Sequence, residues 1–225
     1  MALDDAVDLG GTWTRFHFGP VVLEARATLP PIVLLDKPLG AVTSRVPDGG
    51  APTVFDFLDP ALAEAVQPVG RLDRDSSGLL LLVGDGRLIQ HLGHPKRAIP
   101  RTYLVSVAEE PGAEAVEALR HGEIVLADGH RPRPRKVERT DEGSWTVTLT
   151  EGKYHEVRRM FAAAGTRVSA LRRTDFAGLT LDDLQGTPWR RLAEEEVRAA
   201  YARFGVPLPE AVFEVREVND GNAQG

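Results

Sequence analysis

The chain has 225 residues and contains no cysteine. This excludes disulfide bonds, thiol catalysis and zinc held by cysteine, and leaves the cytoplasm as the default compartment. Long apolar runs are missing too, since no segment approaches the roughly twenty apolar residues that a membrane-spanning helix requires. The N-terminus, MALDDAVDLGG, lacks the basic start and apolar block of a secretory signal. We therefore expect a cytoplasmic protein without a membrane anchor.

A net basic charge is also lacking, because 33 acidic residues outnumber 27 Lys and Arg. The balance is uneven: residues 87–173 carry 16 basic and 11 acidic side chains, and the acidic excess lies on either side. Each of the two basic groups in this segment could be a solvated face, but together they favour a polyanionic partner. The groups are Arg131, Arg133, Arg135, Lys136 and Arg139, and Lys153, Arg158, Arg159, Arg167, Arg172 and Arg173.

Hydrophobic periodicity and turn residues predict strands and helices in mixed order. Expected strands cover 31–38, 78–84, 101–108, 123–129, 133–140 and 144–152, with two more before the last helix. Expected helices cover 53–66 with a break at Pro60, 86–94 capped by Asp85, 111–120, 153–165 closed by Gly165, and about 193–204. The composition from about residue 219 is typical of a disordered tail. The expected fold class is α+β, with one mixed, largely antiparallel sheet and helices packed on it.

The stretch VGRLDRDSSGLLLLVGDG, residues 69–86, places charged residues directly before a strand that is apolar on both faces. Arg71 and Asp73 therefore lie where a loop meets the core, a position at which rigid scaffolds hold reactive groups. Asp73 and Asp75 could equally be turn or capping residues bonded to nearby backbone N–H groups. A carboxylate pair also suggests a glycosidase, but that signal is weak, and the basic middle segment and the lack of a tryptophan series argue against it.

Four blocks occur in order along the chain: KPLGAVTS, GRLDRDSSGLLLL, RTYLV and EGKYHEVRRMFAAAG. They resemble the signature blocks of bacterial ribosomal pseudouridine synthases, and within that group most of all the ribosomal small-subunit pseudouridine synthase A family. The resemblance extends from about Pro31 to about Val197. It implies the pseudouridine synthase catalytic fold and its reaction, in which a uridine base within RNA is detached from its ribose, turned over and reattached through carbon 5. It also implies that no cofactor and no metal takes part.

The resemblance implies roles for individual residues. The expected catalytic residues are Asp73, Tyr103 and Arg158. Asp73 matches the catalytic aspartate, and Tyr103 matches the tyrosine that stacks on the uracil and could also take part in proton transfer at carbon 5. Arg158 matches the basic residue expected to pair with that aspartate, which would offset the cost of a carboxylate in a partly dry pocket. Whether Asp73 attacks the ribose or helps remove a proton to form a glycal is left open. The expected substrate-binding residues are Arg71, Lys37, Arg159, Lys153, Arg133 and Arg135, of which Arg71 and Lys37 could instead brace the loop.

Two features depart from the family pattern. Glu156 stands where close relatives often have glutamine, which puts a negative charge near the pocket or the RNA. Only residues 1–30 precede the first block, and they are too few and too acidic for the RNA-binding domain with which the family usually begins. The predicted domains are a reduced N-terminal segment, 1–30, a catalytic domain, 31–204, and a C-terminal tail, 205–225. His91 and His94 lie three residues apart, but no third ligand is evident and no metal site is expected.

The expected function is the isomerisation of a specific uridine in small-subunit ribosomal RNA. The expected partner is ribosomal RNA or a ribosome assembly intermediate, bound by a monomer. The short N-terminal segment leaves a large-subunit rRNA pseudouridine synthase as an alternative. A non-catalytic RNA-binding protein on the same fold is a second alternative, against which Asp73, Tyr103 and Arg158 argue, because a pure binder needs no carboxylate facing RNA phosphates.

Overall fold

The computed structural model describes residues 13–18 and 21–218, and the chain divides into two compact units. The large unit comprises Pro31–Leu192, and the small unit combines the segments on either side of it. No helix in the described part of the chain is long and apolar enough to cross a membrane. The boundary predicted at residue 204, between the catalytic domain and the C-terminal tail, stays a prediction. The disordered tail expected from residue 219 lies outside the described residues.

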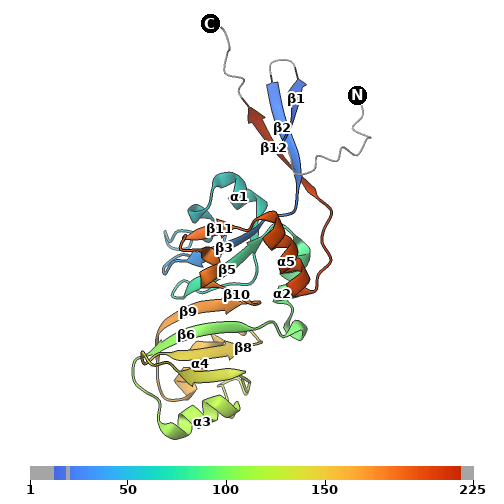
Figure 1. Ribbon diagram of the computed structural model, residues 1–225. Coiled ribbons are helices and arrows are strands. Elements are labelled where there is room, and N and C mark those ends of the chain that lie inside the picture. The colour runs from blue at the N-terminus through green and yellow to red at the C-terminus, as the bar shows by residue number, and fades with distance from the viewer. Residues whose placement is uncertain (1–12, 19–20, 219–225) are drawn as a thin grey trace. The chain divides into compact units, whose positions relative to one another are not determined.

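A mixed sheet forms the centre of the large unit, in the order β11-β3-β5-β9-β6-β8-β7 (Figure 1). Among the described pairs of this sheet, all are antiparallel except β5 with β9. The expected α+β class with a largely antiparallel sheet is confirmed. The strands are β3 (Ile32–Lys37), β4 (Gln67–Pro68), β5 (Ser77–Val83), β6 (Arg101–Val107), β7 (Lys136–Arg139), β8 (Trp145–Leu149), β9 (Val168–Phe176), β10 (Leu179–Thr180) and β11 (Trp189–Arg191).

The parallel junction between β5 and β9 is short, with Ser77 opposite Arg172 and Gly78 opposite Arg173. Gly78 has a φ of +103°, and a Cβ at this position would overlap the backbone carbonyl of Arg173. Only glycine therefore allows the two backbones to approach this closely. The junction brings the loop before β5 next to the residues of β9 and β6.

Short helices cover the sheet and connect its strands. The helix expected over 53–66 is divided at Pro60 into η1 and α1, as predicted, and the Asp85 carboxylate accepts a bond of 2.9 Å from Arg87 N at the start of α2. Helix α4 begins at Glu156 rather than at residue 153, because His155 adopts the left-handed conformation, with a φ of 50°. The helices are η1 (Val54–Phe57), α1 (Pro60–Ala65), α2 (Gly86–Gly93), η2 (Pro95–Arg97), α3 (Ala113–His121), α4 (Glu156–Ala163) and η3 (Leu181–Leu184).

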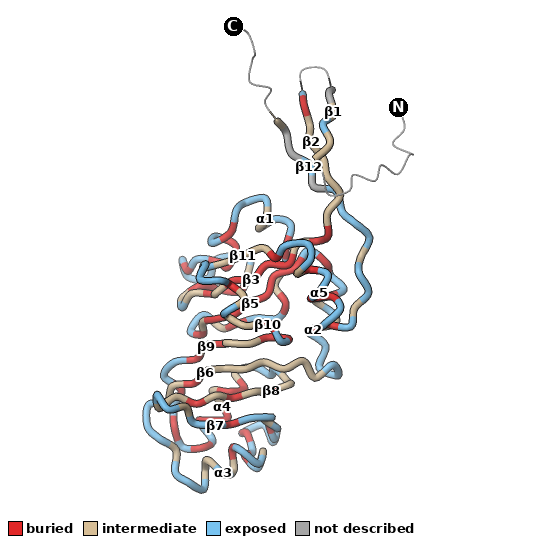
Figure 2. Tube along the Cα trace, in the orientation of Figure 1, coloured by how far each residue is buried: buried red, intermediate tan, exposed pale blue. Residues whose placement is uncertain are grey.

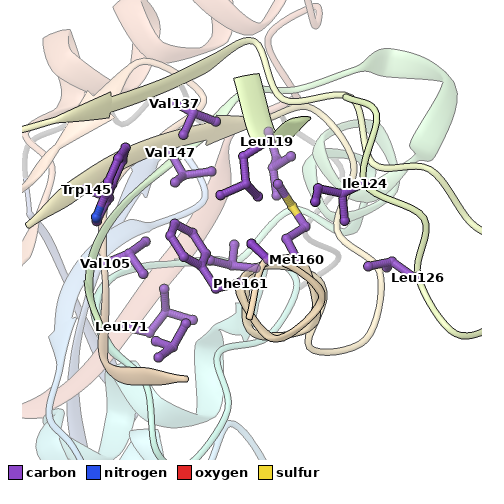
Figure 3. Packing of buried hydrophobic residues seen from close by; sticks show 14 residues of the cluster. Val105, Leu119, Ile124, Leu126, Val137, Trp145, Val147, Met160, Phe161 and Leu171 are labelled. Carbon is purple, nitrogen blue, oxygen red and sulfur yellow. The ribbon is translucent and has the colours of Figure 1, made fainter. Parts of the chain in front are cut away.

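Two apolar clusters hold the large unit together. In one, Met160 and Phe161 of α4 and Leu119 of α3 pack on Val105 and Val147 of the sheet (Figure 3). The other joins residues of β3 and β5 to η1 and its neighbours, and Figure 2 shows these two strands as buried. Tyr103 packs against both clusters. The β6 tyrosine therefore lies where the two halves of the core meet.

The strand expected over 123–129 is wrong. Ile124 and Leu126 are buried and Val125 is exposed, which reproduces the alternation of a strand, but no neighbouring strand pairs with this segment. Its backbone forms a turn instead, in which Leu126 N donates to His130 O at 2.8 Å and Gly129 N donates to Leu126 O at 2.8 Å. Alternation records which side chains meet the core and does not reveal whether a pairing partner exists.

The small unit has its own antiparallel sheet, in the order β1-β2-β12. The N-terminal segment contributes β1 (Thr14–Phe18) and β2 (Val21–Thr28), and the segment treated as a tail contributes β12 (Val212–Val218), which pairs with β2 over its full length. Helix α5 (Glu194–Phe204) precedes β12 and matches the helix expected over 193–204. The two ends of the chain thus build one unit.

Candidate active site

A cavity of about 460 Å³ lies within the large unit. One wall is the loop that leads into β5, a second is formed by β6 and β9, and a third is the turn that leads into α4. Predicted site residues from three separate blocks of the sequence meet here. The polar and charged residues that line the cavity include Arg71, Asp73, Ser76, Arg101, Tyr103, Glu151, Lys153, Tyr154, His155, Glu156 and Arg173.

Asp73 lies on the loop wall, and its side chain is 36% exposed. The backbone of the loop is held without it: Thr43 Oγ1 bonds Leu72 N and O at 3.2 and 2.8 Å, and Ser76 N donates to Asp73 O at 3.0 Å. The Asp73 carboxylate pairs with His155 instead, with 3.3 Å between Oδ2 and Nε2. The Asp73 carboxylate therefore does not cap the turn, and it is available to react with a bound molecule.

Lys37 is fully buried beneath the same loop. Its Nζ donates to the carbonyl oxygens of Ser76, at 2.6 Å, and of Pro38, at 3.1 Å. Burial lowers the pKa of Lys37 to about 8, against the opposing charges of Asp73 and Asp75. The sequence allowed two roles for Lys37, a contact with the RNA and bracing of the loop. The first is corrected, because a fully buried ammonium cannot reach the substrate. The bonds to Ser76 and Pro38 match the second.

The expected ion pair between Arg158 and Asp73 is also corrected. Arg158 Nη2 lies 3.0 Å from Asp75 Oδ2 and donates to the Asp75 carbonyl at 2.8 Å. Asp73 lines the cavity, whereas the Asp75 carboxylate meets Arg158 of α4. Sequence position alone did not reveal which carboxylate would meet the helix, and the partner that does meet Asp73, His155, was missed.

Arg173 is a second residue that the sequence analysis missed, since it counted only as part of a basic group. It lies on β9 directly opposite Tyr103 of β6, and it is fully buried behind the cavity wall. Its Nε donates to Leu79 O at 2.8 Å, and its Nη2 has no hydrogen-bond partner among the described residues. Burial lowers the pKa of Arg173, and the neighbouring Tyr103 opposes this effect. The alternation of Leu171 and Arg173 on an inward strand face was the available signal.

Glu156, the departure from the family pattern, is buried where α4 begins. Its Oε1 lies 3.0 Å from His130 Nε2, and its Oε2 accepts a bond of 3.1 Å from Lys153 N. Burial raises the pKa of Glu156, which the bonds from Lys153 and His130 oppose. His130 Nε2 also lies 3.3 Å from Glu151 Oε2, so one imidazole bridges two carboxylates. These three side chains are of types that bind metal ions, and no spacing in the sequence revealed the group.

The predicted RNA-contacting residues fall into two sets. Arg159 pairs with Asp128 at 2.7 Å, and within the basic groups Lys136, Arg139 and Arg172 also have acidic partners. In contrast, Arg71, Lys153, Arg133 and Arg135 are exposed, and no ion pair of theirs is found among the described residues. The second set is the more available for phosphate groups.

A family model described as RNA pseudouridylate synthase matches residues 31–163, which carry the Asp73 loop, Tyr103 and the whole of α4. The chain belongs to the RNA pseudouridylate synthase family. A ribosomal small subunit pseudouridine synthase A from Haemophilus influenzae is 36% identical over 165 residues, which cover 73% of this chain and 71% of the relative. The Escherichia coli protein of the same name is 36% identical over 169 residues, 75% of this chain and 73% of its own.

The fold agrees with this assignment. A crystal structure of a pseudouridylate synthase superimposes with a TM-score of 0.68 at 32% identity, covering 83% of this chain and 80% of the other. The chain is therefore a pseudouridine synthase, and the recognition made from four sequence blocks is confirmed. A cavity that holds a carboxylate, a phenol and a buried guanidinium suits a base withdrawn from an RNA strand.

Proposed function

We propose that this enzyme converts one specific uridine of small-subunit ribosomal RNA to pseudouridine. The observation that carries the proposal is the Asp73 carboxylate, which faces a cavity lined by Tyr103 and takes no part in holding its own loop. The names of the relatives from Haemophilus influenzae and Escherichia coli support the small subunit as the source of the RNA. Because the chain matches over 70% of each, the catalytic part is comparable.

Within this proposal the residues of the cavity and of its surroundings have different roles. Asp73 is the catalytic carboxylate that acts on the target nucleotide. Tyr103 stacks on the uracil, a contact worth about 1–3 kcal/mol per base. Arg173 gives the wall behind Tyr103 a fixed positive charge, and Arg158 holds the Asp73 loop through Asp75. Arg71, Lys153, Arg133 and Arg135 contact phosphates, with Arg159 contributing less because Asp128 already neutralises it.

We further propose that the enzyme acts as a monomer in the cytoplasm, on naked rRNA or on an assembly intermediate. The N-terminal segment 1–30, the catalytic domain 31–204 and the C-terminal segment 205–225 are functional divisions within this proposal. Recognition of the RNA then rests mainly on the large unit, where the cavity and the exposed basic residues lie.

The test is to map pseudouridines in both ribosomal RNAs from cells with the gene, without it, and with it restored as Asp73→Asn. We expect one small-subunit site to disappear in the deletion, to return with the wild type and to stay absent with the variant. Purified enzyme should then modify protein-free rRNA or an isolated assembly particle at that site. A missing site in the large subunit instead would overturn the proposed substrate.

A further inference from the structure

The turn that leads into α4 presents two stacked rings at the mouth of the cavity. The ring of Tyr154 lies 3.8 Å from that of His155, at an angle of 17°. Tyr154 is 77% exposed, the highest value among the exposed large apolar residues of the large unit. One face of Tyr154 is covered by His155, so the other is free to stack on a further ring.

The backbone of this turn has a conformation that is uncommon for residues other than glycine. His155 is not glycine, yet it has a φ of 50° and a ψ of 31°, a conformation that tends to occur at functional sites. The buried Glu156 holds the turn at both ends, since its N–H donates to Lys153 O and its carboxylate accepts from Lys153 N. A single exposed aromatic residue is ordinary. One held by a strained backbone and a buried carboxylate is better explained by a ligand.

The two rings also lie where three hollows meet. His155 lines the cavity of Asp73 and two further hollows, and Tyr154 lines one of these two. The hollow that Tyr154 shares continues past Arg71 and Arg74. The other is lined by Arg158, Arg159 and Arg167, of which Arg167 is exposed and has no acidic partner among the described residues. A chain leaving the cavity therefore meets stacked rings and then guanidinium groups.

We propose that the Tyr154–His155 stack binds the base of the nucleotide adjacent to the target uridine, while the phosphate beyond it meets Arg167 in the hollow that Arg158 and Arg159 also line. Single-stranded nucleic acids are commonly bound by this combination of aromatic platforms and basic grooves. The proposal rests on the proposed function only in taking RNA as the substrate. It makes Tyr154 a residue that positions the RNA rather than a catalytic one.

The test uses a nine-nucleotide RNA with a single central uridine among cytidines, in which each cytidine is replaced in turn by an abasic nucleotide. One abasic position next to the uridine should weaken binding to the wild type about 5- to 100-fold. Tyr154→Ala should bind the intact RNA as weakly as the wild type binds that abasic RNA, and the two changes together should add little. Tyr154→Phe should behave like the wild type.

Phe57→Ala is the matched control, because Phe57 is a partly exposed aromatic residue that lines none of the three hollows. It should leave the affinity and the abasic profile unchanged. The proposal is overturned if no neighbouring abasic position matters to the wild type, or if Tyr154→Ala retains the full abasic penalty. If no small-subunit site is lost in the rRNA mapping but Tyr154→Ala and the abasic position still show this coupling, the proposed small-subunit substrate is rejected and the nucleotide site is kept. Successful mapping without the coupling would do the reverse.

Discussion

The cavity has two facing walls that are supported by buried groups of opposite charge. The Asp73 loop rests on Lys37, whose ammonium bonds two backbone carbonyl oxygens. The Tyr154–His155 turn rests on Glu156, whose carboxylate bonds a backbone N–H and His130. Burial shifts the two pKa values in opposite directions, down to about 8 for Lys37 and upward for Glu156. Each wall is thus held by a group that is costly to ionise where it lies.

Under the proposed function, this difference separates a wall that performs the chemistry from a wall that binds the RNA. The loop wall carries a carboxylate left without backbone partners, and its support is a cation that also faces Asp73 and Asp75. The turn wall carries rings, and its support is a carboxylate that meets His130, Glu151 and the Lys153 backbone. Changes to the loop wall should therefore lower turnover, and changes to the turn wall should affect binding and stability.

The largest effect is expected for Asp73→Asn, which keeps the size of the side chain and removes its charge. Single-turnover pseudouridine formation should fall by about 10²- to 10⁴-fold or more, because the reacting carboxylate is lost. RNA affinity should be preserved. Asp75→Asn is the control and should keep most of the activity, since Asp75 points toward Arg158. An inactive Asp75→Asn beside an active Asp73→Asn would reverse the assignment.

Lys37→Met removes the support of the loop wall, and turnover should fall about 10- to 100-fold, the range for lost charge-assisted hydrogen bonds. Wild-type turnover should also decline as the pH rises through about 8, where Lys37 loses its proton. The variant should lack that decline. Rates measured from pH 6 to 10 provide the comparison.

The pH dependence of stability is expected to run opposite to that of turnover when the wild type is compared with Lys37→Met. Between pH 8 and 10.5 the unfolded chain holds the Lys37 proton and the folded chain does not, so unfolding becomes harder as pH rises. The free energy of unfolding of the wild type should therefore increase relative to Lys37→Met across this interval. Urea unfolding at several pH values measures it, and an unchanged difference between the two proteins would show that the buried lysine stays charged in this interval.

Arg158→Ala should lower turnover less than tenfold, because its partner Asp75 is 63% exposed and such ion pairs are weak. The part of the loss that comes from the Arg158–Asp75 ion pair should not add to that of Asp75→Asn, since both variants remove this pair. Single-turnover rates of the two variants and of the double variant decide this. If Arg158→Ala were as inactive as Asp73→Asn, the two residues would have to pair during the reaction.

Glu156→Gln should have the smallest effect on turnover and a measurable one on stability. A folded-state pKa above 4.5 means that the folded protein holds the Glu156 proton to a higher pH than the unfolded chain does, so this group costs stability as the pH rises past 4.5. The glutamine variant escapes that cost and should have the higher Tm at pH 8, but not at pH 4. About 1 kcal/mol shifts the Tm of such a chain by about 2–4 °C. Equal Tm values at pH 8 would contradict the expectation.

Local signals predicted much of the fold. The break at Pro60, the Asp85 cap and the apolar run of β5 depend on residues within a few positions of one another, and all three are confirmed. The family resemblance predicted Asp73 and Tyr103 as site residues, and both line the same cavity. The contacts that the sequence did not reveal depend on side-chain direction between distant segments: Lys37 beneath Ser76, Arg158 with Asp75, and His130 between Glu151 and Glu156.

The parallel junction at Gly78 has a consequence for biosynthesis. The bond from Arg173 to Leu79 that closes it joins residues 94 positions apart. Closing so long a loop costs chain entropy before any contact is gained, and a growing chain cannot close it until its second partner has left the ribosome. Asp73 and Tyr103 are translated early, but they come together in one cavity only after β9 has been translated and has paired with β5 and β6. A nascent chain that stops before β9 thus carries the Asp73 carboxylate without the rest of its cavity.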